Sequence, residues 1–210
     1  MRTHVHRRLR NVGHMRFMYD DTVLEPRPWT AAQADWGSEV AHDLAPGPLL
    51  ELCCGVGHIG LLAASSSARD AVLVDASPAA CAFADGNADQ LRPGVDVQIR
   101  CADLEDALRP DETFPLVLAD PPYIPHDQTG AFPQDPLDAI DGGPDGLELA
   151  RICLSVAAAH LVTGGVLILQ LRDDTQVETL VAEDRHGAGL TLREVRETPR
   201  GGALALFLKH

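Results

Sequence analysis

The chain has 210 residues, a formal net charge of −14, and hydrophobic side chains at 45% of its positions. This length is typical of one domain, and the hydrophobic fraction argues against a disordered chain. The acidic balance argues against non-specific binding to nucleic acid, which depends on Lys and Arg side chains that neutralise phosphates.

Basic residues gather at the amino terminus, where residues 1–16 contain Arg2, Arg7, Arg8, Arg10 and Arg16 and no acid. This stretch is either a solvated, frayed terminus or a basic arm that docks on a substrate macromolecule. It has no apolar core behind its charges, so it is not a secretory signal. No apolar run reaches the ~20 residues that a membrane helix needs. We expect a cytoplasmic protein with no membrane partner.

Cysteine usage agrees with that compartment. The five Cys are an odd number and include no CxxC pair, so neither a disulfide framework nor a zinc site is indicated. The nine His are scattered, and we expect no metal ion.

Apolar runs alternate with amphipathic stretches along the chain. Strands are predicted at Leu49–Cys54, Ala71–Asp75, Val95–Arg100, Leu116–Asp120, Gly165–Leu171, Leu190–Glu197 and Ala203–Lys209, the last two joined by a turn at Pro199–Gly202. Helices are predicted at Thr30–Leu44, His58–Ala64, Pro78–Gln90, Gly146–Leu161 and Thr175–Arg185. Thr30 and Ser77 are the expected caps of two of these helices.

This alternation predicts an α/β fold with a seven-stranded, mostly parallel, doubly wound sheet, Rossmann-like, whose last strand is antiparallel. We divide the chain into a basic arm and entry segment at 1–29 and the main domain at 30–210. Ligands of such sheets bind outside the carboxyl ends of the strands.

The first candidate site is a glycine turn after the first of these strands, with Gly55, Gly57 and Gly60, and Asp75 at the end of the next strand. Glycines let a ligand approach the backbone, and an acid at that distance accepts hydrogen bonds from ribose hydroxyls. The same glycines fit the dinucleotide pattern GxGxxG, so they do not distinguish two nucleoside cofactors.

Two acids favour a cationic nucleoside over a dinucleotide. Glu51 places a carboxylate beside the turn, where a pyrophosphate would be repelled, and Asp103 ends a third strand, where it can accept from an adenine amino group. The alternative interpretations are a solvated acid at a strand end for Glu51 and a helix cap for Asp103.

The most specific element is the tetrapeptide Asp120-Pro121-Pro122-Tyr123. The prolines stiffen the backbone, the Asp120 carboxylate and the Pro121 carbonyl can accept from both N–H bonds of a planar nitrogen, and Tyr123 can stack on its plane. Such acceptors turn the nitrogen lone pair toward an activated methyl group. The alternative is an ordinary rigid turn.

These residues resemble class I methyltransferases of the HemK/PrmC type, which methylate a glutamine side-chain amide of peptide-chain release factors. The resemblance covers residues 20–175 and rests on five blocks, which are 24–30 (LEPRPWT), 51–57 (ELCCGVG), 75–78 (DASP) with Ala84 and Asn87, 120–123 (DPPY) and 141–147 (DGGPDGL). The alternative for the last block is a flexible glycine-rich loop.

The resemblance implies S-adenosyl-L-methionine as cofactor and S-adenosyl-L-homocysteine as product. The expected cofactor-binding residues are Arg27, Thr30, Glu51, Cys53, Gly55, Gly57, Asp75, Ala76, Asp103, Leu104 and Asp120. Three residues depart from the family pattern: Asp120 replaces an Asn, Cys53 replaces a glycine, and Trp29 replaces an acid. About 45 residues precede the first predicted strand, too few for the family's helical amino-terminal domain.

The resemblance favours a protein acceptor such as a release factor. Alternative acceptors are another planar nitrogen, in a nucleobase or a small metabolite; Asp-Pro-Pro-Tyr is the form found in many nucleic-acid amino methyltransferases, although the acidic body makes nucleic acid a less favoured partner. An NAD-dependent oxidoreductase would use the same glycines but give the tetrapeptide no role. A protein that binds the cofactor without catalysis is the remaining alternative. The sequence does not determine the oligomeric state.

Overall fold

The computed structural model describes residues 7–183, 189–198 and 202–210. Its strands are β1 (Arg8–Val12), β2 (Met15–Tyr19), β3 (Leu49–Leu52), β4 (Ala71–Asp75), β5 (Val97–Cys101), β6 (Phe114–Ala119), β7 (Leu161–Leu171), β8 (Leu190–Glu197) and β9 (Ala203–Lys209). Its α-helices are α1 (Ala31–Ala41), α2 (His58–Ser67), α3 (Pro78–Ala88), α4 (Glu148–His160) and α5 (Asp174–Glu183), with short 3₁₀ helices η1 (Pro28–Thr30), η2 (His126–Ala131) and η3 (Leu137–Ala139).

Seven strands form one sheet in the order β5-β4-β3-β6-β7-β9-β8. The pairs from β5 to β7 are parallel, and β9 pairs antiparallel with both β7 and β8. The predicted mostly parallel sheet with an antiparallel last strand is therefore confirmed. The predicted turn at 199–202 and the end of the helix predicted to Arg185 fall largely outside the described residues.

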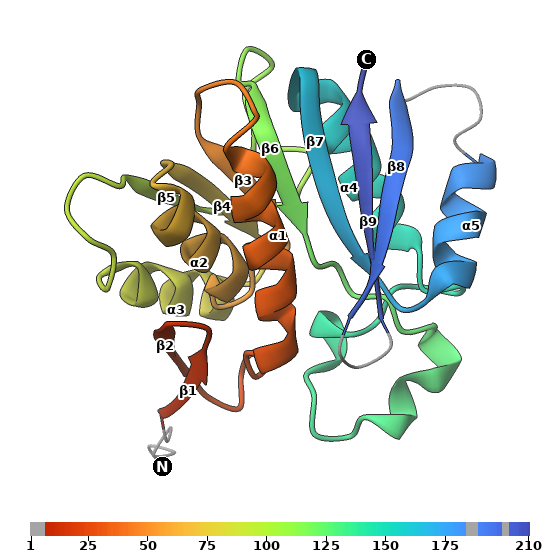
Figure 1. Ribbon diagram of the computed structural model, residues 1–210. Coiled ribbons are helices and arrows are strands. Elements are labelled where there is room, and N and C mark those ends of the chain that lie inside the picture. Colours follow the sequence, from red (N-terminus) through yellow and green to blue (C-terminus); the bar gives the residue numbers. More distant parts are fainter. Residues whose placement is uncertain (1–6, 184–188, 199–201) are drawn as a thin grey trace.

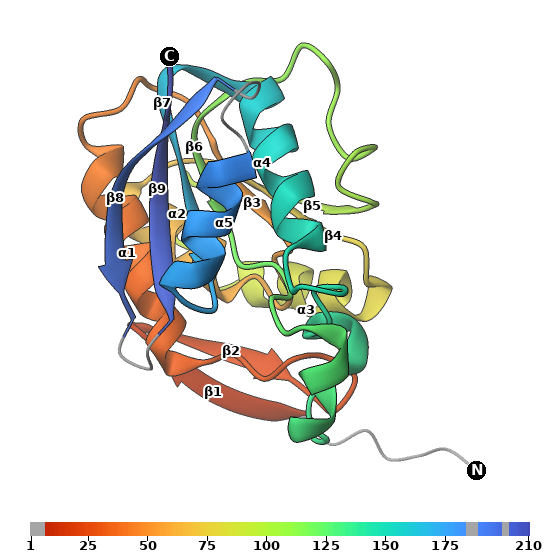
Figure 2. The ribbon, with the colours of Figure 1, turned by 90° about the vertical axis from the view of Figure 1, so that its right-hand side faces the viewer.

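Helices cover both faces of the sheet (Figures 1 and 2). Helices α1, α2 and α3 pack on one face, and α4 and α5 pack on the other, so two separate apolar clusters form. Every residue of β3 and β6 is buried, as expected for central parallel strands, which read as continuous apolar runs. Because these strands run in parallel, their carboxyl ends meet at one edge.

The basic amino terminus differs from the frayed interpretation. Residues 8–19 form an antiparallel hairpin, and its Val12 and Phe17 are fully buried in the cluster beneath α1, α2 and α3. Arg8 and Arg10 form ion pairs with Asp21 and Glu25, so their charge is compensated within the chain. Of the five arginines, Arg2 lies outside the described residues.

Two helix starts show how side-chain caps succeed and fail. Ser77 accepts a hydrogen bond from the Ala80 N–H at 3.3 Å, which confirms the predicted cap of α3. Thr30 makes no cap hydrogen bond to α1, so that prediction was wrong, because its hydroxyl is engaged elsewhere. No helix of the described chain is long and apolar enough to cross a membrane.

Candidate active site

The carboxyl ends of β3, β4, β5 and β6 carry most of the predicted site residues. Leu52 at the end of β3 pairs with Val74 on one side and Ala119 on the other. Asp75, at the end of β4, pairs with Cys101 of β5. The turn after β3, the acid after β4 and the tetrapeptide after β6 therefore share one edge of the sheet (Figure 1).

The glycine turn leads directly from β3 into α2. Gly55 has φ +54° and Gly57 has φ +80°, a conformation that glycine adopts without steric cost. A Cβ on Gly57 would lie 3.1–3.2 Å from atoms of Leu61, Leu73 and Ala84, whereas a Cβ on Gly55 would meet nothing within 4 Å. Gly57 thus allows close packing, and Gly55 borders open space that a ligand can use.

Cys53 stands in the same turn with φ +58°, a conformation that is unusual for a residue with a side chain. The neighbouring Cys153 thiol on α4, together with burial, raises the pKa of Cys53 well above its ordinary value. Cys53 therefore favours the neutral thiol, at the position where the family has a glycine.

Asp75 organises the turn as well as facing it. Its Oδ2 accepts from the Gly55 N–H at 2.7 Å, and its Oδ1 accepts from the Ser77 N–H at 2.8 Å. Burial raises the pKa of Asp75 although both hydrogen bonds lower it. Each oxygen keeps a second lone pair, so the predicted acceptance from ribose hydroxyls is compatible with these contacts.

Glu51 is buried, with 1% of its surface exposed, so its interpretation as a solvated acid is wrong. Its Oε2 accepts from the Gly60 N–H at 2.9 Å, and its Oε1 has no hydrogen-bond partner among the described residues. Burial raises the pKa of Glu51 well above its ordinary value, and the charges of Asp120 and Asp75 raise it further. A Cβ on Gly60 would lie 2.4 Å from Oε2, so the third glycine of the motif makes room for this carboxyl group.

Ala76, Asp103 and Leu104 border the turn on its β5 side. Asp103 is exposed and is followed by turns instead of a helix, so the alternative of a helix cap is wrong. Ala76 is exposed and Leu104 is half-buried. Their predicted contact with the adenine end of a cofactor stays a prediction.

The tetrapeptide follows β6 without a gap. Pro121 and Pro122 are buried, and Asp120 and Tyr123 are half-buried at the edge of the site. Burial raises the pKa of Asp120 to about 7 and, together with the nearby Asp120 charge, raises the pKa of Tyr123 to about 12. Asp120 is thus a carboxyl group that can hold or release a proton near neutral pH.

The block at 141–147 packs against the back of the tetrapeptide. A Cβ on Gly142 would lie 2.6 Å from the Pro122 carbonyl oxygen, and a Cβ on Gly146 would lie 2.4 Å from that of Tyr123. The Tyr123 carbonyl also accepts from the Gln176 side chain at 3.0 Å. The alternative of a flexible loop is therefore wrong, because these glycines permit backbone contacts that hold the corner in place.

Arg27 and Thr30 lie in the entry segment, where they contact each other, His58 and Asp135. The Thr30 hydroxyl donates to the Arg27 carbonyl at 2.7 Å and contacts Nε2 of His58 at 2.8 Å. Since the single hydroxyl proton is used on Arg27, Nε2 of His58 is the donor in the second contact. Arg27 Nη2 donates to both carboxylate oxygens of Asp135, at 2.7 and 2.8 Å.

Three polar residues near the site, two of them buried, escaped the sequence analysis or were named only as part of a motif. His58 is half-buried, desolvation of its ring lowers its pKa to about 4, and its buried Nδ1 has no partner among the described residues. Asn87, named above only as part of a block, bonds the backbone of Met18 and of Val56 in the glycine turn. Gln33 donates to the carbonyls of Ala119 and Ile168. An amide inside an apolar helix pattern is the signal that could have found Gln33 and Asn87.

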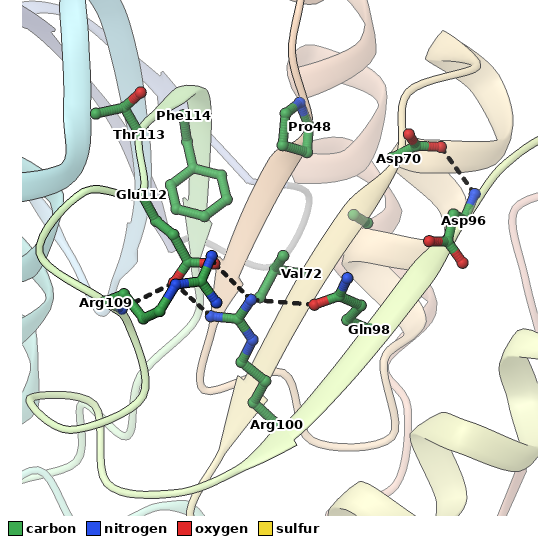
Figure 3. A pocket seen from close by; sticks show the side chains of 11 residues that line it. Pro48, Asp70, Val72, Asp96, Gln98, Arg100, Arg109, Glu112, Thr113 and Phe114 are labelled. Carbon is green, nitrogen blue, oxygen red and sulfur yellow. Dashed lines mark hydrogen bonds and ion pairs between the residues drawn. The ribbon is translucent and has the colours of Figure 1, made fainter.

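A hollow of about 350 Å³ lies at the other end of the same sheet (Figure 3). It opens beside the first residues of β4 and β6, Ala71 and Phe114. Arg100 binds Glu112 through both terminal nitrogens, at 2.8 and 2.7 Å, and Arg109 lies 3.2 Å from the same carboxylate. None of the predicted site residues lines this hollow.

Comparisons with known proteins fit the geometry at the carboxyl ends. The family model described as conserved hypothetical protein 95 matches residues 35–133. The chain is 32% identical to a release factor glutamine methyltransferase of Gloeobacter violaceus, over 86% of this chain and 66% of that protein. It is 32% identical to a ribosomal protein uL3 glutamine methyltransferase of Bordetella pertussis, over 76% of this chain and 55% of that protein.

Solved structures support the fold assignment. A 16S rRNA N2 G1207 methyltransferase from T. thermophilus, in complex with AdoMet and guanosine, superposes with a TM-score of 0.67 at 17% identity, over 98% of this chain and 50% of that chain. The chain spans between about half and two thirds of the length of the two curated relatives. It is therefore a sequence relative of the glutamine methyltransferases, built on the fold of the class I methyltransferases.

Proposed function

We propose that the protein is a cytoplasmic N-methyltransferase that uses S-adenosyl-L-methionine to methylate a glutamine side-chain amide in a protein. The observation that carries the proposal is the half-buried Asp120 carboxyl group, held at a proline corner beside a glycine turn that is lined with further acids. The Asp120 side chain has no hydrogen bond or ion pair to any residue that the structure describes, and it fits a hydrogen-bond acceptor for a planar nitrogen.

The residues around the turn fit a cationic nucleoside. One carboxylate oxygen of Glu51 has no partner in the described part of the chain, and the charges of Asp120 and Asp75 are close enough to raise the pKa of Glu51. A positively charged ligand relieves that repulsion, whereas a dinucleotide pyrophosphate would add to it. Asp75 would hold the ribose, Asp103 and Leu104 the adenine, and Glu51 the charged amino-acid portion.

The bound cofactor supplies an electrophilic methyl group on a sulfonium. Asp120 and the Pro121 carbonyl accept from the two N–H bonds of the acceptor amide, which directs its lone pair at the methyl group and offsets the positive charge that develops on nitrogen. Tyr123 stacks on the amide plane. Alignment of this kind can contribute up to about 7–11 kcal/mol. After transfer, the nitrogen releases one proton, which Asp120 can accept because its pKa is about 7.

The choice of a protein glutamine comes from the relatives, which are named for release factor and uL3 glutamine methylation. A second acceptor, the exocyclic amino group of a nucleobase, is favoured by one observation, the Asp at the position where the family has Asn. The net charge of −14 favours the protein acceptor, since nucleic acid would be repelled.

Transfer of a labelled methyl group tests the proposal. The purified protein is incubated with labelled S-adenosyl-L-methionine and, in parallel, with release factor, ribosomal protein uL3, ribosomal RNA or a metabolite extract. We expect label on a glutamine of one of the two proteins, and none with Asp120→Ala. Label only on RNA or on a metabolite would show that the proposed glutamine acceptor is wrong. No transfer to any of these acceptors would refute the proposed activity.

A further inference from the structure

The segment 124–147 leaves the tetrapeptide and forms one wall of the site. Figures 1 and 2 place it at the same end of the sheet as the β1–β2 hairpin. Its base is fixed, because Ile124 exchanges backbone hydrogen bonds with Ile140 and Gly142 at 3.0 and 2.9 Å. Its outer part, residues 126–139, contains only the short helices η2 and η3 and has no buried residue. We call this outer part the wall.

Two side-chain contacts join the wall to parts of the described chain outside segment 124–147. Arg172, just before α5, donates to the Gln128 side chain at 2.7 Å. Arg27 binds Asp135, a residue 108 positions away, and the two side chains are 26% and 10% exposed. A partly shielded ion pair of this kind is less screened by salt than a surface pair.

The second contact lies beside the tetrapeptide. The Arg27 guanidinium lies 5.7 Å from the centre of the Trp29 ring in the entry segment, and its backbone carbonyl is bonded to Thr30. The charges of Arg27 and Asp135 both reach the Tyr123 hydroxyl, so the pair stands beside the tetrapeptide. It therefore joins the entry segment to the wall close to Tyr123, where the proposed function places the acceptor nitrogen.

The wall presents charge and apolar surface that the chain itself leaves uncovered. Phe132 and Leu137 are 37% and 51% exposed. Asp127 and Asp138 are exposed and have no hydrogen bond or ion pair to any described residue. No Lys or Arg occurs between 124 and 147. This surface is complementary to a polypeptide with cationic and apolar side chains.

We infer that the Arg27–Asp135 pair is a positioning clamp that fixes the wall as the acceptor-binding surface, and that the wall accepts a cationic, partly apolar polypeptide next to the target nitrogen. The inference rests on the proposed function for the nature of the acceptor, but the clamp itself does not. It gives Arg27 a role different from the cofactor contact that the sequence resemblance implies.

The test compares wild type with Asp135→Asn, Arg27→Gln and the exchanged pair Arg27→Asp/Asp135→Arg. We expect each single variant to raise KM for the protein acceptor by about tenfold, with the calorimetric Kd for S-adenosyl-L-methionine unchanged, and the exchanged pair to recover much of the loss. Arg196→Gln, which removes an ion pair with Glu39 on β8 and α1, is the matched control and should change neither value. The double variant Asp127→Asn/Asp138→Asn should raise the acceptor KM and weaken its salt dependence.

Amide hydrogen exchange of residues 126–139 tests the clamp without any acceptor. Exchange should quicken in Asp135→Asn and not in Arg196→Gln. An unchanged exchange rate, an unchanged acceptor KM, or a cofactor Kd that rises in Arg27→Gln alone would each overturn the clamp. Absence of methyl transfer by wild type would instead count against the proposed function, and the exchange result would still decide the clamp.

Discussion

The two ends of the central sheet treat their charges in opposite ways. At the carboxyl ends, Glu51, Asp75 and Asp120 have raised pKa values, chiefly because burial penalises the charged form, and no described cation pairs with them. At the amino ends, Glu112 has its pKa lowered to about 2 by Arg100, which binds it at 2.7 Å. The difference supports the proposed function, in which the carboxyl ends bind a ligand and the amino ends stabilise the fold, because unpaired acids of this kind lower stability unless a ligand pairs with them.

The variant with the largest expected effect on the carboxyl end of the sheet is Asp120→Ala, which should lower turnover. Asp120→Ala removes the acceptor for the nitrogen and the proton, and we expect kcat to fall by about 10²–10³ while the cofactor Kd stays within about threefold. Single-turnover kinetics and calorimetry measure the two quantities. Near-normal turnover would remove Asp120 from the mechanism.

Cofactor affinity gives the next effect. Asp75→Ala deletes the carboxylate that binds both Gly55 and Ser77, so the turn loses its shape and the ribose loses its acceptor. We expect the Kd for S-adenosyl-L-methionine to rise about 10- to 100-fold. Asp70→Ala, at the amino end of the same strand, is the control; an equal loss there would show that the strand and not the site was damaged.

The acids at the two ends should change the free energy of unfolding in opposite directions as pH rises. Folding raises the pKa of Asp120 from its ordinary value near 4 to about 7, so the native state keeps a proton that the unfolded state has released. Without ligand, the unfolding free energy should therefore fall as pH rises from about 4 to 7. Asp120→Asn should remove about 1–2 kcal/mol of that decline in urea titrations, and an unaltered pH profile would contradict the raised pKa.

The amino end should show the reverse dependence and the smallest effect. Glu112 has a lowered pKa, so its contribution is complete above about pH 4 and is lost as pH falls toward 2. Glu112→Gln should cost about 1–2 kcal/mol at pH 7, with methyl transfer unchanged. A rise in the cofactor Kd equal to that of Asp75→Ala would show that the two ends are coupled.

The fold was predictable because the sequence alternates apolar runs with amphipathic stretches, and clear turn residues end the runs. Apolar runs ended by Gly55, Asp75 and the prolines 121–122 marked the strands and placed their ends at one edge, as the structure has them. The hairpin was not predicted, because the many arginines suggested an exposed terminus. The alternation of buried Met15, Phe17 and Tyr19 with less buried residues is the pattern that indicates a strand. Deleting residues 1–16 would thus remove part of the core as well as the arginines, so it does not isolate the role of the arm.

Parts of the site lay beyond sequence reasoning. Arg27 and Asp135 are 108 residues apart, and nothing local predicts that they meet. The burial of Glu51 depends on Gly60, which leaves space for the carboxyl group only once α2 is packed on β3. Residue types at strand ends could be assigned from pattern, whereas their partners and pKa values depend on the tertiary contacts.

Asn87 links the amino-terminal hairpin to the glycine turn through its side-chain amide. Its side-chain amide donates to the carbonyls of Met18 in β2 and Val56 in the glycine turn, and its oxygen accepts from the Met18 N–H. One side chain thereby connects the β1–β2 hairpin to the glycine turn. Proteolytic removal of the first twenty residues would leave the buried Asn87 amide with only its hydrogen bond to Val56. We therefore expect damage to the hairpin to weaken ligand binding at the glycine turn.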